Sequence, residues 1–287
     1  MKIVKFIEIM SNLWDNFLAK IQHLTEKNMT IKIAVTGALG KMGQEVVKAV
    51  VSDKECELVC AIDKYNLGFN VYGDIAIEGD IKKAFELKKP DVVIDFTQPD
   101  IIFENIKTYL DLGVKSVIGT TGLSSEQLSQ IEKLTKEKNT GCFIAPNFST
   151  GAVLMMKFAQ LAAKYFNNAE IIEFHHNQKK DAPSGTAIKT AELMAQVNSN
   201  FKDGNVEEKE LIKGSRGGNF EKAQINIHSV RMPGFVASQE VIFGSMGQTL
   251  KIRHDSINRE CYMDGVLMAV KHVAKNNNFT YGLENIL

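Results

Sequence analysis

The segment IIEFHHNQKKDAPSGT brings an acid, cations and an anion-binding turn together in one short stretch of the chain. His175 and His176 can carry a proton near neutral pH, and Lys179 and Lys180 supply fixed positive charge. The residues from Pro183 to Thr186 are typical of a helix start, where backbone N–H groups can bind an anion. Together these features suit a small anionic substrate that must be protonated.

Adjacent histidines on a regular strand point to opposite faces, so His175 and His176 can share one pocket only at the end of their strand. The pattern places the strand end there, because the chain turns toward Asp181 directly afterwards. A zinc site is the alternative, but no cysteine or carboxylate lies at the usual ligand spacing, and we expect no metal. His228 and His254 lie in other predicted strands and have no comparable cluster around them.

A glycine-rich turn, Gly37 to Gly43, follows the first predicted strand and leads into a helix. Its G-x-x-G-x-x-G spacing is related to the dinucleotide fingerprint, in which glycines let the backbone approach a pyrophosphate at a helix N-terminus. The next strand ends at Asp63, which can accept hydrogen bonds from ribose hydroxyls, whereas Lys64 can meet a 2′-phosphate instead. The spacing favours a dinucleotide site over a purely structural turn.

Small and polar residues also follow later strands of the same predicted sheet. Phe96-Thr97 and the run from Gly119 to Gly122 come just past strand ends, where open α/β sheets bind ligands. The run from Ala145 to Ser149 has the corresponding position after the fifth strand. It can be a hinge with a nicotinamide contact or a plain linker, and spacing alone does not decide between them.

Short apolar runs alternate with amphipathic stretches in the first half of the chain, which predicts a parallel sheet covered by helices on both faces. The predicted strands are 31–36, 57–62, 92–96, 114–118 and 141–145, and the predicted helices are 42–52, 81–88, 101–112 and 124–138. We therefore expect a doubly wound α/β domain.

After Pro146 the pattern changes, and short Gly/Pro connections between β-type runs predict an α+β domain with a mixed or antiparallel sheet. Its predicted elements are helix 151–166, strand 169–175, helix 184–197, an exposed loop at 203–220, and strands 223–231, 236–243 and 249–254. A last helix, 258–275, carries an apolar stripe that can return to the first domain. The expected domain limits are 30–147 with 256–287, and 148–255.

Composition and charge exclude several classes of protein. Lys plus Arg and Asp plus Glu number 34 each, so no net field favours nucleic acid or an anionic membrane, and we expect neither as a partner. The longest apolar stretch, 152–163, is interrupted by Lys157 and Gln160 and predicts a buried helix, because it is too short to span a bilayer. The scattered cysteines form no C-x-x-C pair, which indicates reduced thiols in the cytoplasm.

Residues 1–29 form an N-terminal extension with a pattern of its own. Apolar side chains repeat there at the a and d positions of heptads, namely Ile3, Ile7, Met10, Trp14, Phe17, Ile21 and Leu24. One interpretation is a partner-binding or self-associating helix. The other is an appended segment, because Met29 directly precedes the first strand and can itself be a start.

From about residue 30 to the C-terminus the chain resembles the dihydrodipicolinate reductase family. The most specific part of the resemblance is Glu173-x-His175-His176-x-x-Lys179-x-Asp181-Ala182-Pro183-Ser184-Gly185-Thr186-Ala187. Supporting motifs are Gly37 to Gly43, Asp95-Phe96-Thr97, Gly119 to Gly122 and Asn147-Phe148-Ser149. The chain departs from the pattern at Ala237-Ser238-Gln239, where many relatives carry Gly-Glu-His.

The resemblance implies an α/β Rossmann-type dinucleotide-binding domain joined to an α+β substrate-binding and tetramerisation domain with a mixed sheet. By position, it implies that His175 is the acid–base histidine, His176 a substrate-binding histidine and Lys179 the catalytic lysine. Gly185 and Thr186 would bind a substrate carboxylate. The implied cofactor contacts are Gly37, Ala38, Leu39, Gly40, Lys41, Met42, Asp63, Lys64, Gly119, Thr120, Thr121, Ala145, Pro146, Asn147 and Phe148.

The chemistry that the resemblance implies is reduction of 4-hydroxy-tetrahydrodipicolinate to tetrahydrodipicolinate with loss of water, by a homotetramer that uses NADH or NADPH in the diaminopimelate route to lysine. The substrate is then a small dicarboxylate. Two other hypotheses compete with it. An amino-acid or sugar dehydrogenase would share the first domain but has no reason to carry the histidine–lysine motif. A non-enzymatic dinucleotide sensor leaves His175 and Lys179 unexplained.

Overall fold

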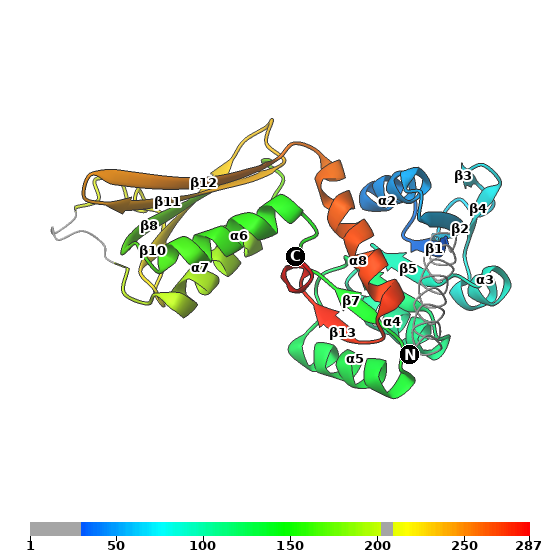
Figure 1. The fold of residues 1–287 in the computed structure, drawn as a ribbon. Coiled ribbons are helices and arrows are strands. Elements are labelled where there is room, and N and C mark those ends of the chain that lie inside the picture. Colours follow the sequence, from blue (N-terminus) through cyan, green and yellow to red (C-terminus); the bar gives the residue numbers. More distant parts are fainter. Residues whose placement is uncertain (1–29, 202–208) are drawn as a thin grey trace, which may run out of the picture.

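The computed structural model describes residues 30–201 and 209–287, so the helix predicted within 1–29 and part of the loop predicted at 203–220 lie outside the described residues. The described chain forms two bodies side by side, each a sheet with helices packed on it (Figure 1). The last helix of the chain lies at the boundary between them (Figure 1).

The first sheet has the strand order β13-β7-β6-β5-β1-β2-β4-β3 and is parallel except for the β3–β4 pair. Its strands are β1 (Ile31–Thr36), β2 (Cys56–Ile62), β3 (Asn70–Tyr72), β4 (Ile75–Glu78), β5 (Val92–Asp95), β6 (Lys115–Ile118), β7 (Cys142–Ile144) and β13 (Phe279–Tyr281). The sequence did not predict β3, β4 and β13, because runs of three or four residues are too short to show a clear period.

Helices cover both faces of this sheet. They are α2 (Lys41–Ser52), α3 (Ile81–Lys88), α4 (Ile102–Asp111), α5 (Ser125–Lys138) and α8 (Met263–Lys275). Apolar residues of α2 and α8 share one core, whereas those of α3, α4 and α5 share another on the opposite face. The predicted doubly wound α/β class is confirmed, because the alternation of strand and helix leaves each helix one apolar side to bury.

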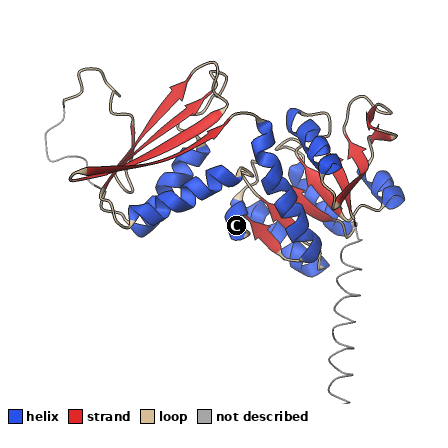
Figure 2. Ribbon diagram, turned by 45° about the horizontal axis from the view of Figure 1, so that its top comes forward, coloured by secondary structure: helices blue, strands red, loops and turns tan. Residues whose placement is uncertain are grey.

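The second sheet is mixed and has the order β12-β11-β8-β10-β9. Its strands are β8 (Asn168–His175), β9 (Gly218–Phe220), β10 (Ile225–Arg231), β11 (Ala237–Ser245) and β12 (Gln248–Ser256), and β8 and β10 alone pair in parallel among these described strands. Helices α6 (Thr150–Ala163) and α7 (Gly185–Val197) pack on one face of it (Figures 1 and 2). The predicted α+β domain with a mixed sheet is therefore confirmed, and β9 is a strand within the segment predicted to be a loop.

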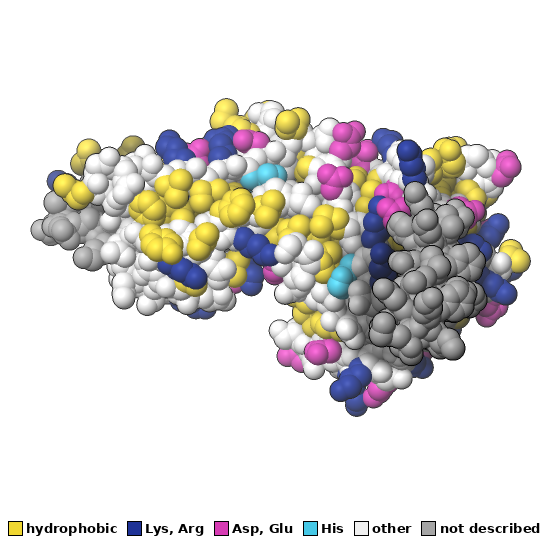
Figure 3. Space-filling model, in the orientation of Figure 1, with side chains coloured by type: hydrophobic (Ala, Val, Ile, Leu, Met, Phe, Trp, Pro, Cys, Tyr) yellow, Lys and Arg dark blue, Asp and Glu magenta, His cyan; other side chains and the backbone are white. Residues whose placement is uncertain are grey.

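Helix α6 is buried on one side only, although its sequence predicts a buried helix. Its outer side carries Leu154, Phe158 and Leu161, which are exposed by 38%, 53% and 54%. Figure 3 shows hydrophobic side chains gathered over α6 on the face toward the viewer. Within the described ranges, no helix is both long and apolar enough to cross a bilayer.

The last predicted helix divides into two parts. Residues Arg259–Tyr262 form a 3-10 turn, and α8 begins only at Met263. The apolar stripe of α8 then packs into the core of the first domain, as the sequence predicts. The limits predicted for the domains remain a prediction, and the two sheets fall on either side of residues 147 and 148 apart from the returning C-terminal segment.

A buried carboxylate holds the strand ends of the first sheet. Asp95, at the end of β5, is fully buried and accepts hydrogen bonds from the Thr97 backbone N–H (2.8 Å) and the Tyr109 hydroxyl (2.7 Å). The Thr97 and Thr120 hydroxyls also donate to it, at 2.6 and 3.2 Å. Burial, followed by the Asp95 charge, raises the pKa of Tyr109, so this hydroxyl keeps its proton. One anion thus orders the loops after β5 and β6.

Replacing Tyr109 by Phe should therefore destabilise the first domain. The change removes a buried donor to a buried carboxylate and should lower the free energy of unfolding by about 1–3 kcal/mol. Urea denaturation followed by circular dichroism measures this. Tyr165→Phe is the matched control, because Tyr165 is 77% exposed, and it should change stability by less than about 0.5 kcal/mol. Equal stability of the Tyr109→Phe and parent proteins would contradict the role given to this bond.

Candidate active site

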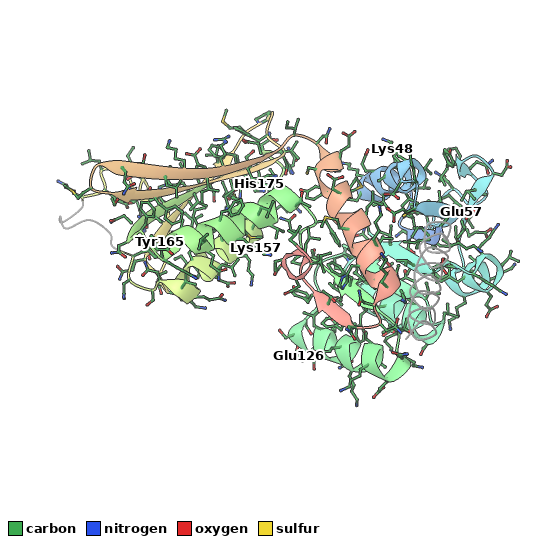
Figure 4. The ribbon with its side chains drawn as sticks, in the orientation of Figure 1. Lys48, Glu57, Glu126, Lys157, Tyr165 and His175 are labelled. Carbon is green, nitrogen blue, oxygen red and sulfur yellow. The ribbon has the colours of Figure 1, made fainter. Side chains whose placement is uncertain are left out.

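A cavity of about 430 Å³ lies where the two domains meet. Figure 4 places His175, the last residue of β8, near this junction. The lining includes Met42, Phe96, Gly119, Pro146, Asn147 and Phe148 from the first domain and its connection, and His175, His176, Lys179, Ser184 and Thr186 from the second. The tertiary structure thus brings the histidine–lysine segment and part of the expected dinucleotide site to one space.

His175 is held by a buried carboxylate on its own strand. Its Nδ1 lies 2.5 Å from Glu173 Oε2, and Arg231 of β10 donates to both Glu173 oxygens, at 2.8 and 2.7 Å. Glu173 is fully buried. Burial alone would raise the pKa of Glu173, but hydrogen bonds from His175 and Arg231 outweigh it and lower that pKa to about 2. Glu173 is therefore an anion at neutral pH.

Lys179 lines the cavity with its ammonium group paired to Asp181. Both Asp181 oxygens lie 2.8 Å from Lys179 Nζ, and this pair lowers the pKa of Asp181. His176 is more exposed, and its Nδ1 accepts the Gln178 backbone N–H at 3.2 Å. Lys180 is exposed and does not line the cavity, so the two neighbouring lysines have different surroundings.

The start of α7 has the form that the sequence predicts. The Ser184 hydroxyl caps the helix by accepting the Ala187 N–H at 3.2 Å. The first-turn N–H groups of Gly185 and Thr186 have no intrahelical acceptor and can bind an anion. Thr186 lines the cavity, whereas Gly185 lies next to the lining residues without being one of them.

His254, for which the sequence predicts no neighbouring functional groups, also lines the cavity. His254 of β12 lies with Nε2 3.2 Å from the Ser149 hydroxyl, which also caps α6. The prediction that His254 has no functional groups around it is therefore wrong. The sequence did not show this contact, because the fold is what brings β12 to the start of α6. Burial lowers the pKa of His254 and favours its neutral form. His228 instead pairs with Glu170 at 2.8 Å, outside the cavity lining.

Other lining residues were not predicted as site residues. They are Ser149, Ala152, Met155, Val236, Ala237, Ser238, Gln239, Ser256, Arg259 and Tyr262. Gln239 is buried and donates to the Thr190 hydroxyl at 2.7 Å, which in turn donates to the Thr186 carbonyl at 2.8 Å. The segment that departs from the family pattern therefore supports the start of α7 from β11.

Most backbone N–H groups of the glycine turn are hydrogen-bonded to acceptors within the protein. Gly37 and Ala38 donate to the Ile62 carbonyl at 2.9 and 3.1 Å, and Gly40 donates to the Gly37 carbonyl at 3.0 Å. In the first turn of α2, the N–H groups of Lys41 and Met42 lack intrahelical acceptors and can meet a phosphate. Of the turn residues predicted to contact a cofactor, Met42 alone lines the cavity.

Asp63 lies beside this turn, as a ribose-binding carboxylate must. It accepts the Leu39 N–H at 3.0 Å and the Tyr65 N–H at 3.3 Å. Lys64 is exposed, with its ammonium group 5.0 Å from the centre of the Tyr65 ring. The carboxylate is therefore fixed by backbone donors, whereas the lysine is held only by an exposed aromatic ring.

The remaining predicted cofactor residues lie at the ends of β6 and β7. Thr120, Thr121 and Pro146 line a second, smaller cavity of about 50 Å³. The Thr120 hydroxyl is bonded to Asp95, and Ala145 is buried without lining either cavity. Among the described residues, no group of three or more His, Cys, Asp or Glu side chains is arranged to hold a metal ion.

The fold and the cavity define a class of protein, a two-domain protein with a Rossmann-type parallel sheet in which paired histidines and a lysine of the second domain line the cavity between the domains. Two family models match the chain in tandem. The N-terminus of dihydrodipicolinate reductase matches residues 31–148, and the C-terminus of dihydrodipicolinate reductase matches residues 151–287. The chain belongs to the dihydrodipicolinate reductase family.

Relatives agree with this assignment. The 4-hydroxy-tetrahydrodipicolinate reductase of Listeria innocua is 49% identical over 264 residues, which are 90% of this chain and 100% of the relative. That of Syntrophomonas wolfei is 50% identical over 89% of this chain and 98% of the relative. A dipicolinate-bound dihydrodipicolinate reductase from Paenisporosarcina has a TM-score of 0.83 and 44% identity, over 90% of this chain and 100% of that one.

Adding a methyl group at Gly43 should disrupt the expected dinucleotide site. A Cβ there would lie 2.0 Å from the Gly37 carbonyl oxygen and 2.8 Å from Ala38 Cα, and these backbone atoms cannot move without deforming the turn. We expect Gly43→Ala to weaken nucleotide binding by at least about tenfold, measured by fluorescence titration of NADH and NADPH. Gly244→Ala is the control, because a Cβ at Gly244 meets nothing within 4 Å. Unchanged affinity in Gly43→Ala would contradict this assignment.

Proposed function

We propose that the chain catalyses the reaction of its family, the reduction of 4-hydroxy-tetrahydrodipicolinate to tetrahydrodipicolinate with loss of water, in the diaminopimelate route to lysine. The observation that carries this proposal is the cavity in which His175 and Lys179 face Met42, Gly119 and Asn147. Acid–base side chains and a dinucleotide-binding sheet edge meet there, as hydride transfer coupled to protonation requires.

The substrate proposed for this chain is a small dicarboxylate. Its relative from Paenisporosarcina binds dipicolinate. In this chain one carboxylate would meet the N–H groups of Gly185 and Thr186, and His176 would hold the substrate at the exposed side of the cavity. The Lys179 ammonium would exchange part of its bonding with Asp181, which is 62% exposed at its side chain, for the substrate.

Different residues of this chain would protonate the substrate, orient it and shape the nicotinamide side of the cavity. Loss of the 4-hydroxyl as water would leave a conjugated imine, and C4 of that imine would accept the hydride that a reduced nicotinamide supplies when bound. Electrons would move toward the ring nitrogen, and the resulting enamine needs one proton on carbon, for which His175 and Lys179 are the two candidate donors and His175 is the proposed one. The Gly185 and Thr186 N–H groups orient the ring, and Pro146, Asn147 and Phe148 shape the nicotinamide side of the cavity.

We propose both NADH and NADPH as cofactors. Asp63 lies against the glycine turn and suits the free ribose hydroxyls of NADH. The neighbouring Lys64 is exposed and can approach a 2′-phosphate, which Asp63 repels. The remaining proposed contacts are the turn residues Gly37, Ala38, Leu39, Gly40, Lys41 and Met42, together with Gly119, Thr120, Thr121 and Ala145.

The open face of the second sheet supports a homotetramer as the proposed assembly. Helices α6 and α7 pack on one face, and the other carries Ile172, Phe174 and Ile242, which are only partly buried. Arg253 lies over the Phe174 ring, 5.0 Å from its centre. Such a mixture of apolar and charged groups fits a self-complementary interface between sheets. The cytoplasmic location expected from the cysteines remains a prediction.

The proposed reaction is tested by following NADH or NADPH absorbance in the presence of freshly generated product of the preceding synthase. We expect oxidation of both nucleotides, with turnover efficiencies within about a hundredfold of each other, because Asp63 and Lys64 favour opposite cofactors. Binding of nucleotide without turnover would indicate a sensor instead. A larger preference would show that one of the two side chains dominates.

Replacing His175 by Ala should lower kcat by roughly 10²–10⁴ and leave nucleotide affinity nearly intact, because the imidazole is the proposed proton donor and lies on the second domain. Steady-state kinetics and nucleotide titration measure the two effects separately. Lys180→Ala is the control from the same segment, since Lys180 is exposed outside the cavity lining, and should keep the parent turnover. Parent-like turnover of His175→Ala would refute the assignment.

A further inference from the structure

We propose that Glu173 is a positioning residue for the reaction, because it holds His175 in the tautomer and orientation that let its Nε2 exchange a proton with the substrate. Arg231 has a supporting role as the fixed partner of Glu173. This inference rests on the proposed function, in which His175 is the proton donor. Glu173 itself does not line the cavity, so it acts through His175.

The strand geometry places the two side chains on one side of β8. Residues two apart on a strand point to the same face, so Glu173 and His175 both lie on the face that α6 and α7 cover, His175 at the end where the cavity begins. Sheet register completes the arrangement from β10, because Arg231 pairs directly with His175 across the parallel ladder. The guanidinium then reaches both oxygens of Glu173, at 2.8 and 2.7 Å.

All the contacts of Glu173 come from donors. Oε2 meets His175 Nδ1 at 2.5 Å and Arg231 at 2.8 Å, and Oε1 meets Arg231 at 2.7 Å and the Ser184 N–H at 3.2 Å. An ionised carboxylate has no proton to give, so the hydrogen in the His175 contact lies on Nδ1. The other ring nitrogen, Nε2, is then the one that can gain or lose a proton in the cavity.

This arrangement permits a complete proton transfer. Protonated His175 carries hydrogens on both nitrogens, and release of the Nε2 proton to the substrate carbon leaves a neutral ring with its hydrogen still on Nδ1 beside Glu173. Glu173 contacts the ring and Arg231 contacts Glu173. The other titratable or charged residues that line the cavity with His175 are His176, Lys179, His254, Arg259 and Tyr262. Glu173 is the carboxylate in direct contact with the imidazole, and it can accept the Nδ1 hydrogen both before and after the transfer.

Glutamine at this position would have a single acceptor oxygen where Glu173 offers two. It could not serve both His175 and Arg231, and its amide N–H would favour a ring with the hydrogen on Nε2, which cannot leave without forming an anionic imidazole. We expect Glu173→Gln to lower kcat by roughly 10²–10⁴ with KM for nucleotide nearly unchanged.

A double-mutant cycle separates positioning from a general structural role. If Glu173 acts through His175, adding Glu173→Gln to His175→Ala should change kcat by less than about threefold, whereas an independent structural defect would multiply the two losses. Parent-like kcat of His175→Ala would defeat the proposed function itself. A slow His175→Ala enzyme with a parent-like Glu173→Gln enzyme would overturn this inference and leave the function standing.

A measurement on the unaltered protein covers the case in which Glu173→Gln fails to fold. Nitrogen-15 NMR of labelled histidine distinguishes the two neutral tautomers, and the His175 signals are assigned by their absence in His175→Ala. We expect the neutral His175 ring to carry its hydrogen on Nδ1. A ring with its hydrogen on Nε2 would overturn the inference.

Discussion

The buried ion pair between Glu173 and Arg231 holds together the part of the second domain on which the proposed chemistry depends. A buried carboxylate without partners is strongly unfavourable, and here donors surround both of its oxygens. The same guanidinium also donates to the Asp181 carbonyl at 2.7 Å. One charge pair therefore connects the end of β8, the turn that carries Lys179 and the start of α7.

The first domain orders its own side of the cavity by the same physical means. Asp95 collects donors from the loops after β5 and β6 and from Tyr109 of α4. Loops expose backbone polar groups that need partners, and apolar packing cannot provide them. A buried carboxylate can accept hydrogen bonds from those groups. Each domain has such a carboxylate close to the cavity. The cavity is therefore lined from two domains, each ordered by its own buried carboxylate, which meet where Phe148 and Ser149 lead from one sheet to the next.

Much of the fold was predictable because its elements are long enough to show their period. The helices from α2 to α5 and the central strands agree with the pattern of apolar residues, and the capping box of Ser124 and Gln127 marks the start of α5. The short strands β3, β4, β9 and β13 were missed or lay within predicted loops. The helix prediction for the end of the chain was wrong in one respect. A 3-10 turn precedes α8 where the sequence predicts a continuous helix.

The amino-acid sequence indicates which functional groups are available: paired histidines at a strand end, a lysine three residues later, a serine-capped helix start and a glycine turn after the first strand. The sequence shows them because each is a pattern of residues close together along the chain. The pairing of Arg231 with Glu173 and of His254 with Ser149 depends on the fold, because strand register and the packing of β12 on α6 bring together residues far apart in the chain. The fold also determines that the Gly37 and Ala38 N–H groups are already bonded, since their acceptor, Ile62, is on another strand.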